Sequence, residues 1–211
     1  MAEFEALKPS NTGWLIADVL PDTHAYTWSR LQADPALLAL LCDPQWQPCV
    51  VFPGEFAAPE RVVTDVWMQP VGDANTHAKG NTDPSAPIVA TPPTRRPLFV
   101  LLDGTWSEAR KMFRKSPYLD ALPVLSLQPE QLSRYRLRRS THAHHFCTAE
   151  VAALCLALAG DTQAAHTLDA YLDVFSTRYL QARQSVPADP TDAAHQRLHA
   201  LQSPPHCAAR M

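Results

Sequence analysis

The residues best suited to chemistry lie in one stretch, Leu98 to Lys115, which reads LFVLLDGTWSEARKMFRK. Asp103 stands directly after an apolar run of strand length, in a turn that it shares with Gly104. A carboxylate in such a turn can act as a general base or as an oriented hydrogen-bond acceptor. It can equally bond its own backbone and serve only to shape the turn. Asp103 is therefore a candidate catalytic residue with a structural alternative.

A second candidate catalytic carboxylate is Glu150, one turn into a helix expected to start at Thr148. Its alternative is also structural, because negative charge near a helix N-terminus is favourable by itself. The residue types alone leave both roles of Glu150 open.

Basic residues gather around the first candidate. Between Arg95 and Arg139 there are ten basic and four acidic residues, so the segment carries ten minus four, or +6, in a chain of net charge −3. This asymmetry indicates a polyanionic partner, with a solvated basic face as the alternative. Tyr135 beside Arg136 combines an aromatic ring with a cation, as in contacts to single-stranded nucleic acid, or else anchors a loop. The candidate RNA contacts are Arg110, Lys111, Arg114, Lys115, Tyr135 and Arg136.

The sequence predicts no metal site. His142, His144 and His145 are close in sequence, but no acid or cysteine at ligand spacing completes a set before Cys147, which favours a solvated histidine loop. The five cysteines are scattered without a C-x-x-C pair, as expected of free thiols in a reducing cytoplasm. No apolar run approaches the roughly 20 residues that span a bilayer, and no signal peptide is visible, so we expect a cytoplasmic protein. The usual nucleotide-binding and hydrolase motifs are absent.

The elements that must position these residues alternate between helix and strand. Leu98–Leu102 predicts a strand buried on both faces, and the Thr105–Glu108 capping box predicts a helix that ends before Pro117. Further strands are expected at 24–28, 49–52 and 124–127, and helices at about 11–20, 36–42, 148–159 and 161–184. We therefore expect an α/β fold with a mainly parallel sheet and flanking helices, and a ligand site beyond the carboxyl ends of the strands.

The chain length allows one domain, expected over residues 1–186. A stretch rich in Pro, Gly, Asn, Thr and Ser at about 72–95 predicts a flexible surface insertion, with a domain linker as the alternative. The polar segment 128–146 predicts a long loop. Residues 187–211, rich in Pro, Ala and His, are expected to form a disordered tail.

Six motifs, in order along the chain, resemble the DTW-domain family of tRNA-uridine aminocarboxypropyltransferases. They are Lys8–Gly13 (KPSNTG), Val50–Pro53 (VVFP), Asp103–Trp106 (DGTW), Ser116–Leu119 (SPYL), Ser133–Arg136 (SRYR) and Cys147–Glu150 (CTAE). The resemblance implies a SPOUT-like fold with a C-terminal trefoil knot. Bacterial relatives place a cysteine-rich, zinc-binding segment before the first motif, whereas only Met1 to Leu7 precede it here.

The resemblance also implies a reaction and a ligand. The 3-amino-3-carboxypropyl group of S-adenosylmethionine would move to N3 of a tRNA uridine in the variable loop, and methylthioadenosine would leave. Asp103 would act as base or orient the uracil. Glu150 would be the second candidate for this role, or would hold the donor's amino group. The donor would contact residues from four loops: Pro53, Gly54, Asp103, Gly104, Thr105, Leu125, Leu127, Thr148 and Ala149.

Two alternatives to this activity follow from the same features. The same donor also serves SPOUT-type RNA methyltransferases. A chain without the N-terminal segment would also fit a non-catalytic RNA-binding protein.

Overall fold

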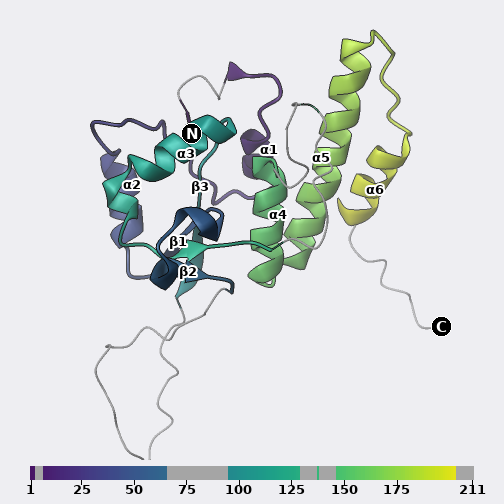
Figure 1. Ribbon diagram of the computed structural model, residues 1–211. Coiled ribbons are helices and arrows are strands. Elements are labelled where there is room, and N and C mark those ends of the chain that lie inside the picture. Colours follow the sequence, from purple (N-terminus) through teal and green to yellow (C-terminus); the bar gives the residue numbers. More distant parts are fainter. Residues whose placement is uncertain (3–6, 66–94, 129–136, 138–145, 203–211) are drawn as a thin grey trace, which may run out of the picture.

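The computed structural model describes residues 1–2, 7–65, 95–128, 137 and 146–202. At its centre lies a four-stranded sheet of order β2-β4-β1-β3, in which all pairings are parallel (Figure 1). Its strands are β1 (Trp46–Val51), β2 (Val62–Val63), β3 (Arg96–Leu101) and β4 (Val124–Leu125). The mainly parallel sheet expected from the sequence is confirmed.

The strand boundaries differ from the expected ones. β1 starts at Trp46 rather than Cys49 and ends before Phe52, and β4 ends at Leu125 rather than Leu127. β2 has no counterpart among the expected strands, because two residues are too few to show a periodicity.

Helices cover both faces of the sheet. Neighbouring residues of each strand point to opposite sides, so an apolar strand presents apolar side chains to be buried on both faces. Val50 and Val124 pack beneath α3 (Trp106–Arg114), together with Leu41 of α2 (Pro35–Cys42). Val51 and Leu125 pack against Cys155 of α4 (Thr148–Leu158) on the other side. The ends of β1 and β4 are thus buried on both faces. The same expectation is wrong for the run Leu98–Leu102: β3 spans Arg96–Leu101 and lies at the edge of the sheet, where its residues are exposed or half-buried.

A further helical layer lies outside α4. α1 (Gly13–Val19) and α5 (Thr162–Arg183) pack against α4 through a second core that includes Leu15, Ala152 and Leu168 (Figure 1). Within the described ranges, no helix combines the length and the apolar character that crossing a bilayer requires.

The expected helix ends are mostly confirmed. Thr105 and Glu108 form the capping box at the start of α3, and Asp161 accepts from the Ala164 amide at the start of α5. Gly160 ends α4 with a φ of 85°, a left-handed conformation that favours glycine. The expected cap at Thr148 is wrong: Cys147 is the N-cap of α4, and the Thr148 hydroxyl donates to Asp103 instead.

The strand expected at 24–28 is also wrong. Its side chains alternate in type, but the segment forms no strand in the described part of the chain. Its Trp28 amide donates to the Met1 carbonyl at 2.8 Å, and the Trp28 indole donates to Ser116. The segment is therefore held by individual contacts rather than by a sheet ladder.

The disordered tail expected at 187–211 is wrong for part of its length. Residues Ala193–Gln202 form α6, which packs along α5. Asp192 accepts from the His195 amide at its start, and Arg197 bridges Asp169 and Asp173 of α5. The prediction rested on composition alone. Composition shows neither the N-cap at Asp192 nor the ion pairs of Arg197 with another helix. Residues 203–211 lie outside the described residues.

Three expectations fall wholly or mainly outside the described residues. They are the insertion at about 72–95, the loop at 128–146 and the contacts of Tyr135 and Arg136. The trefoil knot stays a prediction.

Candidate active site and basic surface

Asp103 lies in the turn between β3 and α3, and its side chain is buried, with 7% of the residue exposed. Its Oδ2 accepts a hydrogen bond of 2.8 Å from Asn11 Nδ2, and its Oδ1 accepts one of 2.6 Å from Thr148 Oγ1. Its backbone carbonyl accepts from the Ala2 amide at 2.9 Å. A buried carboxylate needs such partners, because burial without hydrogen bonds is costly. Asp103 is therefore held in one orientation by two neutral donors from distant parts of the chain.

Asn11 is itself fixed by the start of α1. Its Oδ1 accepts from the Gly13 amide at 2.6 Å, so its amide nitrogen faces Asp103. A Cβ added at Gly13 would lie 2.9 Å from Asp103 Oδ2, closer than real Cβ atoms approach. Glycine at position 13 thus allows α1 to begin directly against the carboxylate.

Thr12 links the same stretch to α4. Its hydroxyl oxygen accepts from the Ala149 amide at 3.3 Å, next to the contact between Thr148 and Asp103. Residues from the KPSNTG, DGTW and CTAE motifs therefore meet at one point. Figure 1 shows the start of α1 beside the start of α4.

Glu150 is buried and takes part in capping α4. Its Oε2 accepts from the Cys147 amide at 2.8 Å. Burial raises the pKa of the Cys147 thiol to about 12, and the negative charge of Glu150 adds to the effect. The contact with Cys147 supports the structural role of Glu150 at the start of α4. Its contact with a donor stays a prediction.

The residues expected to contact a donor differ in burial. The carboxylate-bearing turn continues through half-buried Gly104 to exposed Thr105, whose hydroxyl donates to Glu108. Leu125 and Ala149 are almost fully buried, and their side chains belong to the core. The remaining members, Pro53, Gly54, Leu127 and Thr148, are exposed or half-buried.

Two of these loops are tied together across the sheet. The Gly54 amide donates to Ser126 Oγ at 3.0 Å, which joins the loop after β1 to the loop after β4. The Ser126 amide in turn donates to the Val63 carbonyl at 2.9 Å. The loops that follow β1 and β4 therefore share one edge of the sheet with the Asp103 turn.

The four candidate RNA contacts at α3 are all exposed: Arg110, Lys111 and Arg114 lie in the helix, and Lys115 is its C-cap. The Arg110 guanidinium lies 4.7 Å from the centre of the Phe56 ring, and Lys111 Nζ lies 5.7 Å from the centre of a Trp28 ring. The helix buries its opposite face through Ala109, Met112 and Phe113.

Sequence reasoning missed the partners of these groups. Asn11 and Thr12 belong to a quoted motif, but nothing local shows that they face Asp103. Trp28 and Phe56 give no signal beyond their aromatic character. Among the described residues, no group of three or more His, Cys, Asp or Glu side chains lies close enough to hold a metal ion. A cavity of about 430 Å³ between α1, α5 and α6 is lined by none of the candidate residues.

The chain was compared with known protein families and with solved structures. No solved structure matches the chain. The DTW domain matches residues 1–180, which include the Asp103 turn, its partners Asn11 and Thr148, and α3. The chain therefore belongs to the DTW domain family, which is associated with tRNA modification.

Proposed function

We propose that this chain transfers the 3-amino-3-carboxypropyl group of S-adenosylmethionine to N3 of a tRNA uridine and releases methylthioadenosine. The observation that carries the proposal is the buried Asp103 carboxylate, held by Asn11 and Thr148 at the carboxyl edge of a parallel sheet. Ligands of open α/β sheets bind at this edge.

The arrangement of the loops at this edge supports a donor site. β1 pairs with β3 through Val51 and Leu101, and with β4 through Val51 and Leu125, so the loops after the three strands leave side by side. Half-buried Gly54, Gly104 and Leu127 would line the donor, above the buried side chains of Leu125 and Ala149. Thr148 lies at the same edge because it donates to Asp103.

The protein's own task in this reaction is to place and deprotonate N3. When bound, the donor supplies an alkyl carbon that its sulfonium group already activates. Positioning N3 in line with that carbon lowers the barrier, because reactants held in the correct geometry react as if within one molecule. Asp103 accepts the N3 hydrogen bond and takes the proton as the nitrogen–carbon bond forms.

Asp103 retains the capacity for this step. Each carboxylate oxygen has two lone pairs, and Asn11 and Thr148 use one on each oxygen. Their hydrogen bonds also fix the direction of the remaining lone pairs. Asn11 and Thr148 thus act as positioning residues for Asp103.

The partner in this proposal is tRNA, held through its phosphates by the exposed cations of α3. Phosphate contacts supply affinity and orientation without reading sequence. Three exposed cations on α3 and a fourth, Lys115, at its C-cap suit this role.

The decisive experiment incubates the chain with unmodified tRNA and with S-adenosylmethionine labelled in its aminocarboxypropyl group. The expected result is label in the RNA together with free methylthioadenosine. Formation of S-adenosylhomocysteine would instead indicate methyl transfer and overturn the proposal. Tight tRNA binding without either product would indicate a non-catalytic RNA-binding protein.

A further inference from the structure

The cations of α3 have no ionic partner within the part of the chain that the structure describes. Arg110, Lys111, Arg114 and Lys115 are exposed, and none of them has a described carboxylate within ion-pair distance. Arg110 and Arg114 are one helical turn apart, as are Lys111 and Lys115, so each pair repels. An anionic partner would relieve this repulsion.

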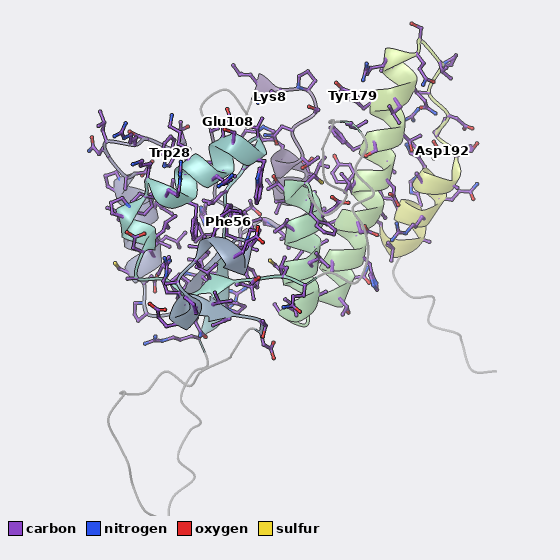
Figure 2. The ribbon with its side chains drawn as sticks, viewed as in Figure 1. Lys8, Trp28, Phe56, Glu108, Tyr179 and Asp192 are labelled. Atoms are coloured by element: carbon purple, nitrogen blue, oxygen red, sulfur yellow. The ribbon has the colours of Figure 1, made fainter. Side chains whose placement is uncertain are left out.

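Two of the four cations nevertheless have fixed positions. Arg110 lies over the Phe56 ring and Lys111 over the Trp28 ring, both within about 6 Å, the range in which a cation is attracted to a ring face. Trp28 and Phe56 lie on either side of α3 (Figure 2). Arg110 and Lys111 are therefore directed to opposite edges of the exposed helix face.

The two rings are anchored in the protein. The Trp28 indole donates to Ser116 Oγ at 2.9 Å, and Ser116 is buried. Phe56 makes edge contacts with Phe52 and Trp106, with ring centres 5.6 and 5.7 Å apart. Both rings also pack on the core beneath α3. A cation over an anchored ring has fewer conformations to lose when it binds an anion.

The anchored cations follow the Asp103 turn directly. Trp106 is the first residue of α3 and follows the turn by two positions. It stacks on Phe52 with ring centres 5.4 Å apart and makes an edge contact with Phe56, so it belongs to the same aromatic cluster as the Phe56 ring. Arg110 lies about one helical turn further along α3.

We propose that Phe56 and Trp28 are positioning residues of the RNA surface. They hold Arg110 and Lys111 for two phosphates of the tRNA backbone beside the nucleotide that reaches Asp103. A guanidinium stacked on a ring keeps its N–H edges in plane for a phosphate. This inference rests on the proposed function, because tRNA is the ligand.

The test is a double-mutant cycle on tRNA affinity. It distinguishes the effect of losing the Phe56 ring from the effect of losing the Arg110 charge. Arg110→Ala should weaken binding and lower the slope of log affinity against log salt by about 0.7 to 0.9, because one phosphate contact is lost. Phe56→Leu keeps the charge, so it should weaken binding about two- to fivefold with an unchanged slope. In the Arg110→Ala background, Phe56→Leu should have no further effect.

Matched variants keep the result interpretable. Phe56→Tyr retains the ring and should bind like the parent, and Leu158→Ala changes an exposed apolar residue on α4 and should have no effect. If Phe56→Leu does not fold, the same cycle with Trp28→Leu and Lys111→Ala gives the same readout.

The inference is overturned if Phe56→Leu binds like the parent, or if it weakens binding equally with and without Arg110. In either case the parent still binds tRNA, and the proposed function is untouched. If the parent binds no tRNA, the proposed function itself fails.

Discussion

Replacing Asn11 tests the geometry around Asp103 most directly. Asn11→Ala removes the 2.8 Å donor to a buried carboxylate oxygen and leaves the Gly13 amide without its 2.6 Å acceptor. Hydrogen bonds to charged groups contribute about 1.5–3 kcal/mol, and neutral ones about 0.5–1.5 kcal/mol. The free energy of unfolding should therefore fall by about 2–4.5 kcal/mol. At this chain length, that loss lowers Tm by roughly 4–18 °C.

A nearly isosteric variant adds a pH dependence that follows from this contact. Asn11→Asp places a second carboxylate within hydrogen-bond distance of Asp103, and two carboxylates this close repel when both are ionised. The folded pair therefore holds one proton to a higher pH than an unfolded aspartic acid does. The stability contributed by the shared proton is therefore complete at low pH. It is lost as pH rises through the range in which the folded pair titrates.

The assay is thermal unfolding followed by circular dichroism between about pH 4.5 and 8. Relative to the parent at each pH, Asn11→Asp should be strongly destabilised at pH 8 and should recover toward pH 4.5, whereas Asn11→Ala should show a similar deficit throughout. An Asn11→Asp protein that matches the parent at pH 8 would refute the contact between Asn11 and Asp103.

Three further outcomes are expected. Asp103→Asn should fold and bind the donor, because its amide can still accept from Asn11 and donate to the Thr148 hydroxyl, but its turnover should fall about 10²–10⁴-fold; turnover equal to the parent would make Asp103 structural. Arg197→Ala should increase hydrogen exchange in α6 while costing only about 1 kcal/mol, because its ion pairs are partly exposed; unchanged exchange would show that other contacts hold α6. In a Cys207→Ser background at pH 8, a thiol reagent should modify exposed Cys42 but not Cys147, because burial raises the pKa of the Cys147 thiol to about 12. Peptide mass mapping identifies the labelled cysteines. Rapid labelling of Cys147 would contradict its burial.

The parts of the fold that depend on local sequence were predictable. The Thr105–Glu108 box and the Gly160 stop each act within a few residues, and the structure has them where the pattern indicates. The apolar run before Asp103 does form a strand, although β3 starts two residues earlier and ends one residue earlier than the run. The parallel sheet follows from the alternation of strands and helices.

The missed features depend on contacts between distant residues. Asn11 and Asp103 are 92 positions apart, and the hydroxyl of Thr148 serves Asp103 rather than its own helix. α6 needs Asp169 and Asp173 of another helix to hold Arg197. Periodicity and capping rules carry no information about such partners.

The wide sequence separation of the groups around Asp103 has a consequence for protein synthesis. The bond from Ala149 to Thr12 joins residues 137 positions apart, and Thr148 follows Asp103 by 45 positions. A nascent chain on the ribosome therefore cannot assemble the carboxylate's surroundings until α4 has left the exit tunnel. Translation must therefore reach α4 before the Asp103 carboxylate gains both of its hydrogen-bond partners.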